Sequence, residues 1–277
     1  MKILLIHNKY FHRGGEDLVY ESERDILIRN GHEVESMVFT NEQISSLWTK
    51  LTVALGAVYN RKSHRLLLEK IKSFGPDVIH VHNFFHIASP SIFFAAYSSG
   101  VPVVMTLHNF RLICPSATLF FEGDIYEKSV DKIFPMDAVL KGVYRNSRVE
   151  TLLVVLVTGI HKLLGTWRGK VNQYIALTDF SRRKILGSSL KITENQIVVK
   201  PNFVEDYGAN LLLRSEHFLY VGRLSEEKGI KMLLESASKQ SEITYKIIGD
   251  GPLRAYVEDF AATHTNVEYL GFRDKEY

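Results

Sequence analysis

Short apolar runs alternate with longer amphipathic stretches along the chain, a pattern typical of βαβ units built around a parallel sheet. Residues 3–6 form the first fully apolar run, and Gly31 ends the helical pattern that follows. In the first half, strands are predicted at 3–6, 33–39, 78–81, 103–107, 174–177 and 198–199. Helices are predicted at about 16–30, 61–74, 91–98 and 149–164 and from Phe180, whereas 111–148 has no clear period.

A second run of the same kind begins at residue 218. Its predicted strands are 218–221, 245–248 and 267–270, and its predicted helices are about 230–240 and 253–263. Lys200-Pro201-Asn202 is a natural linker between the two runs, because proline cannot continue a central ladder. We therefore expect an α/β protein with two Rossmann-like parallel-sheet domains, residues 1–200 and 201–277.

Composition and charge narrow the class of protein. With 45% hydrophobic and 23% charged residues the chain is globular, and a net charge of +3 is too small to indicate a nucleic-acid partner. The single cysteine, Cys114, excludes an internal disulfide framework and any cysteine-built zinc site, and we expect it to be a packing residue. The start resembles neither a signal nor a transit peptide, and the most apolar stretch, 152–157, is too short to span a bilayer. A cytoplasmic location is expected.

Three predicted strands end in the same dipeptide: His7-Asn8, His82-Asn83 and His108-Asn109. In open parallel sheets, ligands bind outside the carboxyl ends of the strands, so these side chains are expected at the ligand-binding edge. Histidine and asparagine supply donors, acceptors and a titratable group, which suits a hydroxyl-rich ligand.

A metal site is the alternative use of these histidines. His80 and His82 are two residues apart and therefore share one face of a strand. A third ligand would have to come from His86 or His108, and no local spacing requires either. We expect no metal and no cofactor.

Gly14-Gly15 lies between the first strand and its helix. Without Cβ atoms the backbone can approach a ligand closely, and helix amides can meet an anion. Glu16 and Asp17 would repel a phosphate there, so a sugar-hydroxyl contact or a plain tight turn is equally compatible with the sequence. The pattern is not GxGxxG, which argues against a nicotinamide dehydrogenase.

The second half contains a cationic loop after its first strand. The strand ends in Gly222-Arg223, and Lys228 follows near the start of the next helix, where a cation is locally unfavourable. Two cations and helix amides suit a diphosphate, although salt bridges to Glu226 and Glu227 would also explain them. The next strand leads into a second glycine-rich loop that contains Gly251.

Residues 141–172 carry a local excess of positive charge, with six lysines and arginines against Glu150. Basic residues beside an apolar helix fit an anionic membrane surface, and they equally fit a solvated face beside a buried helix.

Together these residues resemble the family 4 (group 1) nucleotide-sugar glycosyltransferases with the GT-B fold. The resemblance lies in Gly14-Gly15, the histidine-bearing strand ends at 77–83 and 106–109, the Pro201-Asn202 turn, and the loops at 221–229 and 249–253. His108-Asn109-Phe110-Arg111-Leu112, followed by Cys114-Pro115, resembles the bacterial polysaccharide and lipopolysaccharide branch, whose members act on lipid-linked acceptors at the cytoplasmic membrane face.

The resemblance implies roles for individual residues. His108 would sit beside the donor sugar as the catalytic residue, with Asn109, His82, Gly14 and Gly15 lining the acceptor and donor loop. Arg223, Lys228, Gly222 and Gly251 would hold the donor diphosphate. The reaction implied is transfer of a hexosyl group from a nucleoside-diphosphate sugar to a glycan or lipid-linked acceptor, with retained configuration and no metal, by an enzyme peripheral to the membrane.

One departure from the family pattern affects the expected activity. The family's donor domain normally continues past Gly271-Phe272 to a Glu-x7-Glu segment that grips the sugar and ribose. Because this sequence stops at Tyr277, we expect the second domain to be incomplete. A truncated, non-catalytic nucleotide-sugar-binding or assembly partner is therefore the alternative function.

Overall fold

The chain forms two compact units, Met1–Val204 (unit 1) and Glu205–Tyr277 (unit 2). The computed structural model describes residues 1–9, 14–40, 56–85, 87–204, 206, 208 and 216–273. Both units contain a parallel sheet flanked by helices, which is the α/β architecture that the sequence predicts.

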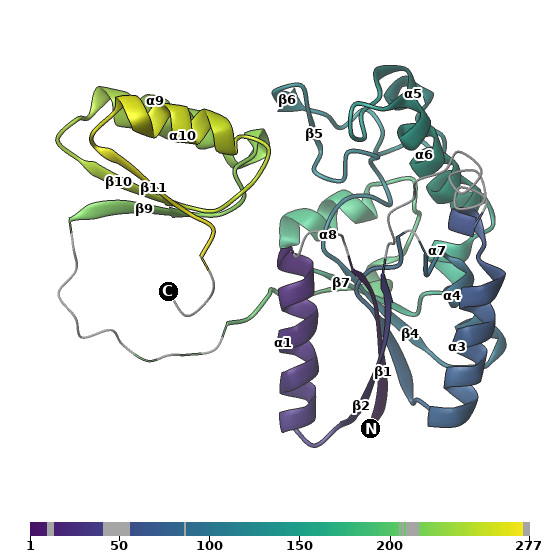
Figure 1. Cartoon of the computed structure of the whole chain (residues 1–277). Coiled ribbons are helices and arrows are strands. Elements are labelled where there is room, and N and C mark those ends of the chain that lie inside the picture. The colour runs from purple at the N-terminus through teal and green to yellow at the C-terminus, as the bar shows by residue number, and fades with distance from the viewer. Residues whose placement is uncertain are drawn as a thin grey trace. The chain divides into compact units, whose positions relative to one another are not determined.

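Unit 1 is built on a six-stranded parallel sheet in the order β2-β1-β3-β4-β7-β8 (Figure 1). The strands are β1 (Lys2–Lys9), β2 (Glu33–Thr40), β3 (Val78–Val81), β4 (Val103–Leu107), β7 (Gln173–Ala176) and β8 (Ile197–Val199). The chain order reverses between β1 and β3, and such a switch point opens a crevice at the carboxyl ends of its strands.

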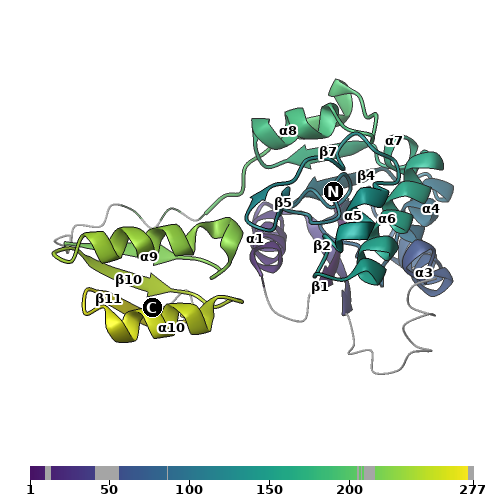
Figure 2. The same ribbon diagram turned by 90° about the horizontal axis from the view of Figure 1, so that it is seen from above.

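Helices cover both faces of this sheet (Figures 1 and 2). They are α1 (Gly15–Arg29), α3 (Arg61–Phe74), α4 (Ser91–Ser98), α5 (Met136–Lys141), α6 (Arg148–Leu163), α7 (Thr166–Gly169) and α8 (Asp179–Leu186). In both views α1 lies on one side of β1, and α3 and α4 lie on the other.

The side chains of β1 alternate between two cores. Leu4 and Ile6 belong to the main core, together with Leu67 of α3. Ile3 and Leu5 pack on the opposite face against Tyr20 of α1. Because both faces are buried, the strand is a continuous apolar run without polar alternation.

The segment without a clear period, 111–148, folds around a small core of its own. It contains a hairpin of β5 (Phe120–Phe121) and β6 (Asp124–Ile125), followed by α5. Cys114 is fully buried in this cluster, and burial raises the pKa of its thiol. Its expected role as a packing residue is confirmed.

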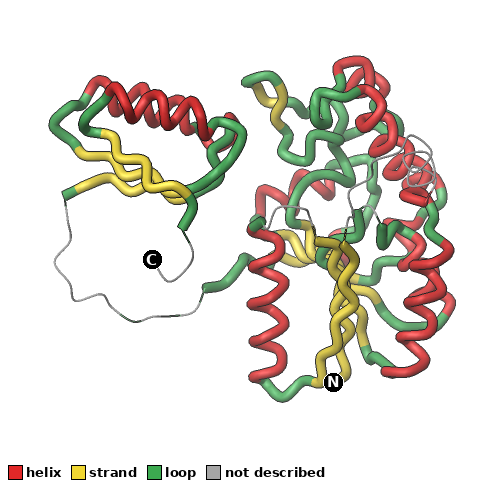
Figure 3. Tube along the Cα trace, in the orientation of Figure 1, coloured by secondary structure: helices red, strands yellow, loops and turns green. Residues whose placement is uncertain are grey.

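Unit 2 contains a three-stranded parallel sheet in the order β11-β10-β9. Its elements are β9 (His217–Val221), the short 3-10 helix η2 (Glu226–Lys228), α9 (Ile230–Lys239), β10 (Thr244–Ile248), α10 (Arg254–Thr263) and β11 (Val267–Gly271). Both helices lie on one face of the sheet (Figure 3). Leu234 and Val257 belong to the same core as Ile247. Leu219 and Val221 of β9 are exposed.

No helix among the described residues is long and apolar enough to cross a membrane.

Gly159, in the middle of α6, provides a test of the unit 1 core. A Cβ atom there would lie 2.4 Å from Phe134 Cε1 and 2.8 Å from the Ile133 carbonyl oxygen. In Gly159→Ala we expect overpacking to cost about 2–3 kcal/mol, the upper part of the usual range, because the Cβ atom also meets a backbone oxygen. The gain in helix propensity is roughly 0.8–1.0 kcal/mol, so the free energy of unfolding should fall by about 1–2 kcal/mol.

Urea unfolding followed by the fluorescence of the two tryptophans, Trp48 and Trp167, measures this effect. Gly169→Ala is the matched control, because a Cβ atom at Gly169 meets nothing within 4 Å. A Gly159→Ala protein as stable as the wild type would contradict the prediction.

Candidate functional site

Three adjacent strands bring His7, His82 and His108 to one edge of the unit 1 sheet. His7 lies in β1, His82 directly follows β3, and His108 directly follows β4. His82 Nδ1 lies 3.1 Å from His108 Nε2, and the two rings stack with centroids 5.3 Å apart. The His7 ring meets the edge of His82 at a centroid distance of 6.4 Å. The expected strand-end histidines therefore form one cluster.

The asparagines of the three dipeptides hold the loops that follow the strands. Asn8 Oδ1 accepts from the amides of Ile87 and Ala88, at 3.1 and 3.3 Å. Asn83 donates to the carbonyl of Asn8 at 2.9 Å, and its own Oδ1 accepts from the amide of Phe85. Asn8 and Asn83 thus position the loop that follows β3.

Asn109 forms a more exposed link. Its Nδ2 donates to Glu16 Oε1 at 2.7 Å, and its Oδ1 accepts from the Arg111 amide at 3.0 Å. Glu16, His82, His108, Asn109 and Arg111 are among the residues around a cavity of about 20 Å³, which has room for roughly one water molecule. The sequence marks Glu16 only as a carboxylate that would repel a phosphate, and the structure adds it to the site.

The inward face of α1 is polar where it meets these histidines. Asp17, Tyr20 and Glu23 are its buried residues. Asp17 Oδ1 accepts from His7 Nε2 at 2.8 Å, and its Oδ2 accepts from the Gly14 amide at 2.8 Å. The carboxylate of Asp17 therefore satisfies the amide of the residue that caps the helix.

The glycine pair has two different environments. Gly14 is the N-cap residue of α1 with an extended backbone, whereas Gly15 is exposed. A Cβ atom at Gly15 would meet nothing within 4 Å. Gly14 therefore forms the turn that begins the helix, and Gly15 presents an exposed surface beside it.

Burial keeps the clustered imidazoles neutral near pH 7. Burial is the main cause of the lowered pKa of His7 and of His80. It lowers the pKa of His82 strongly and that of His108 to about 4. Repulsion among the neighbouring histidines adds to the effect at His82 and His108. Burial also raises the pKa of Glu16, against the opposing effects of Asn109 and Arg111.

In unit 2, the loops after β9 and β10 are joined backbone to backbone. The Leu224 amide donates to the Asp250 carbonyl at 3.0 Å, and the Leu253 amide donates to the Leu224 carbonyl at 2.9 Å. A Cβ atom at Gly251 would lie 2.5 Å from the Leu224 carbonyl oxygen. Gly251 thus permits the close contact between the two loops.

Arg223 and Lys228 are both exposed on this pair of loops. Glu226 pairs with Lys231 at 2.6 Å, and Glu227 accepts from the Ser225 hydroxyl at 2.6 Å. Among the described residues, neither Arg223 nor Lys228 forms an ion pair. The salt bridges to Glu226 and Glu227, which would also have explained the two cations, are therefore not formed. The Tyr220 hydroxyl donates to the Arg223 carbonyl at 3.0 Å and steadies the loop.

The candidate residues therefore form two groups. Gly14, Gly15, His82, His108 and Asn109 lie at the carboxyl edge of the unit 1 sheet. The remaining ones, Gly222, Arg223, Lys228 and Gly251, lie at the corresponding edge of unit 2.

Residues 193–277 match the family model described as "Glycosyl transferases group 1". The matched segment contains all of unit 2, including the loops of Arg223 and Gly251. No curated protein matches the chain.

Solved structures share the fold of the whole chain. The structure of Anabaena Alr3699/HepE in complex with UDP has a TM-score of 0.57 and 16% identity, over 99% of this chain and 70% of that one. WaaG, a glycosyltransferase involved in lipopolysaccharide biosynthesis, has a TM-score of 0.53 and 12% identity, over 99% of this chain and 71% of that one. These neighbours confirm the expected GT-B-like, Rossmann-like fold class.

The Gly251 contact generates a prediction for unit 2. We expect Gly251→Ala to separate the two loops, so that the Leu224 amide exchanges about tenfold faster, in line with a loss of roughly 1.4 kcal/mol. Hydrogen–deuterium exchange measures this amide directly. Tryptophan fluorescence is the internal control, because both tryptophans of the sequence fall within unit 1 and their signal should not change. Unchanged exchange at Leu224 would show that the loops tolerate the added methyl group.

Proposed function

We propose that this protein is a glycosyltransferase that moves a hexosyl group from a nucleoside-diphosphate sugar to a glycan or lipid-linked acceptor in surface polysaccharide synthesis, with retained configuration. The proposal is supported by the family match over residues 193–277 and by the GT-B-like fold. HepE has been crystallised with UDP and with UDP-glucose, and WaaG takes part in lipopolysaccharide biosynthesis. In this proposal, residues 1–200 form the acceptor-side domain and 201–277 belong to the donor domain.

The observation that carries the proposal is the exposed cation pair in the matched segment. Arg223 offers a planar fork of donors and Lys228 a compact charge, and together they suit the oxygens of a diphosphate. The carboxylates nearest in sequence, Glu226 and Glu227, are engaged by Lys231 and Ser225. Arg223 and Lys228 would also stabilise the charge that develops on the diphosphate as it leaves.

His108 is proposed to stand beside the donor sugar. Because burial lowers its pKa to about 4, its imidazole is neutral at physiological pH and acts as a hydrogen-bonding group. Its Nε2 faces His82, so Nδ1 is the nitrogen directed to the sugar in this proposal. Asn109 and Glu16 supply further acceptors and donors for hydroxyl groups at the same edge.

Calorimetric titration of UDP tests the diphosphate assignment. We expect the Arg223→Ala/Lys228→Ala double variant to lose at least a hundredfold in affinity, since each charged hydrogen bond contributes about 1.5–3 kcal/mol. Lys231→Ala is the matched control, because Lys231 is an exposed lysine of the same unit whose ammonium pairs with Glu226. Equal affinity in the wild type and the double variant would remove the assignment, and turnover with a panel of donor sugars separates transfer from binding alone.

We further propose a peripheral membrane contact through α5 and α6. Val149, Leu152, Leu156 and Leu163 are exposed at helical spacing along α6. Exposed Lys141 and Arg148 precede this stripe in the sequence. A basic, apolar helix face of this kind suits an interface with anionic lipids.

Not all of the basic stretch is available for such a contact. Lys162 donates to the Lys132 carbonyl at 3.0 Å, and burial lowers the pKa of its ammonium to about 8. Arg145 lies 3.5 Å from the carboxylate of Glu150.

Vesicle co-sedimentation tests the membrane contact. We expect the wild type to sediment with phosphatidylglycerol vesicles and Leu152→Ser/Leu156→Ser to lose most of this binding, because the apolar stripe is interrupted. Met232→Ser is the control, since Met232 is exposed on α9 of unit 2. If the wild type fails to bind at both low and high salt, the membrane contact is wrong.

A further inference from the structure

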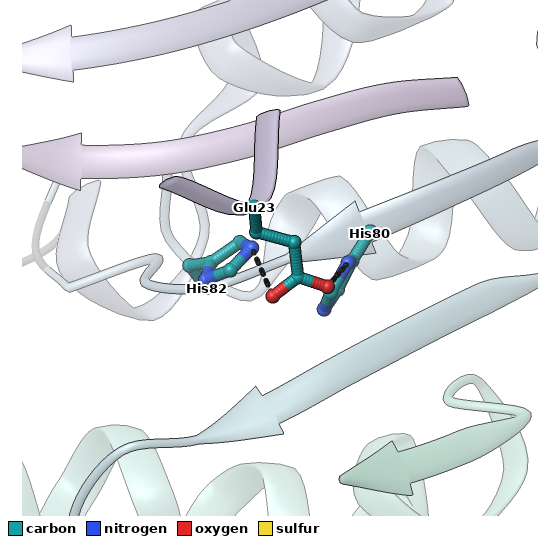
Figure 4. A group of neighbouring side chains, drawn as sticks. All are labelled: Glu23, His80 and His82. Atoms are coloured by element: carbon teal, nitrogen blue, oxygen red, sulfur yellow. Dashed lines mark ion pairs between the residues drawn. The ribbon is translucent and has the colours of Figure 1, made fainter. Parts of the chain in front are cut away.

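Two histidines and a carboxylate converge between α1 and β3 in unit 1. His80 Nδ1 lies 3.4 Å from Glu23 Oε1, and His82 Nε2 lies 3.8 Å from Glu23 Oε2. Figure 4 shows the Glu23 carboxylate between the two rings. The exposed fraction of each of the three side chains is 8% or less.

In each ring the nitrogen that does not face Glu23, here called the outer nitrogen, contacts a second residue. His80 Nε2 lies 2.8 Å from Thr106 Oγ1, and His82 Nδ1 lies 3.1 Å from His108 Nε2. If both outer nitrogens carry the proton, His80 Nδ1 and His82 Nε2 present their lone pairs towards Glu23. Metal-binding histidines are typically oriented in this way, with the far N–H donated to a neighbouring acceptor.

His82 Nε2 is an unsatisfied polar atom in this arrangement. It is buried and has no hydrogen-bond partner among the described residues. A separation of 3.8 Å from Glu23 is too long for a hydrogen bond. A lone pair and a carboxylate oxygen that face each other across such a gap attract a cation.

We propose that Glu23, His80 and His82 form a binding site for a divalent transition-metal ion of the Zn²⁺ class. Ligand atoms about 2.0–2.1 Å from Zn²⁺ in a tetrahedral site are about 3.3–3.4 Å apart. The 3.4 Å between His80 Nδ1 and Glu23 Oε1 matches this spacing, and the 3.8 Å between His82 Nε2 and the other oxygen, Oε2, is somewhat longer. All three ligand atoms lie within 4.8 Å of one another. Neutral imidazole and carboxylate are also the donors that this class of ion accepts.

Glu23, the third proposed ligand, could not be identified from spacing in the sequence. From the sequence, His86 or His108 is the possible third ligand, and His86 lies outside the described residues. His108 instead contacts the outer nitrogen of His82. Glu23 reaches the site from the inner face of α1.

Lys200 is the cation with which a metal ion would compete. Its ammonium donates to Glu23 Oε1 at 3.2 Å, and 47% of its side chain is exposed. The lysine can therefore swing into solvent when a doubly charged ion takes its place. This competition predicts opposite effects for two substitutions: loss of Glu23 weakens metal binding, and loss of the Lys200 charge strengthens it.

The site would act on His108 through His82. A metal ion on His82 Nε2 holds the proton on Nδ1, which then donates to His108 Nε2 and orients that ring. The role is one of positioning, and it does not depend on the proposed sugar transfer. Metal binding can therefore be measured on the protein without any donor or acceptor.

Titration of the untagged, chelator-treated protein tests the site. We expect Zn²⁺ to bind with one-to-one stoichiometry, and Co²⁺ to give the visible absorption of a low-symmetry site with nitrogen and oxygen ligands. Glu23→Gln should weaken Zn²⁺ binding at least tenfold, and Lys200→Met should strengthen it severalfold. His32→Gln is the control, because His32 lies in unit 1 away from these ligands and should leave the binding unchanged.

Circular dichroism and tryptophan fluorescence verify that each variant is folded. If Glu23→Gln does not fold, His80→Gln and Lys200→Met still decide the question, since their expected effects have opposite signs. Absence of stoichiometric binding in both the wild type and Lys200→Met would overturn the proposal. Equal affinity in the wild type, His80→Gln and Lys200→Met would overturn it as well.

Discussion

The carboxyl edge of the unit 1 sheet depends on the pairing of a polar helix face with polar strand ends. Buried carboxylates are costly unless they are paired and hydrogen-bonded. Asp17 meets both His7 and the Gly14 amide, and Glu23 meets Lys200. Because these partners come from β1, the helix start and the end of β8, the pairing fixes α1 against the sheet and holds the histidines in one arrangement.

The loops of unit 2 are stabilised in a different way. Their geometry rests on backbone hydrogen bonds between Leu224, Asp250 and Leu253 and on the absence of a side chain at Gly251. No ion pair with a described residue holds the exposed cations Arg223 and Lys228. A loop fixed by its backbone can keep its charged side chains for a ligand, which is the arrangement expected of an anion-binding site.

Periodicity alone predicts most of the fold, because it reflects burial. The run at 3–6 reads as a strand since Ile3 and Leu5 face one core while Leu4 and Ile6 face the other. It does not predict where β1 ends, because His7 and Asn8 are polar yet still pair with Val38 and Phe39. Segment 111–148 is held by the small core around Cys114, a tertiary arrangement that leaves no regular period in the sequence.

The candidate site was only partly predictable, for a physical reason. Strand ends converge by topology, so the dipeptide at His7, His82 and His108 could be assigned to one edge. Glu23 could not, since an acidic residue in the middle of a helix usually faces solvent, and here it is buried beside His80 and His82, which are distant in sequence. A carboxylate on the inner face of a helix is favourable only where its partners have already been placed by the sheet. A site of this kind therefore becomes visible when burial and pairing are considered together, and motif spacing alone does not reveal it.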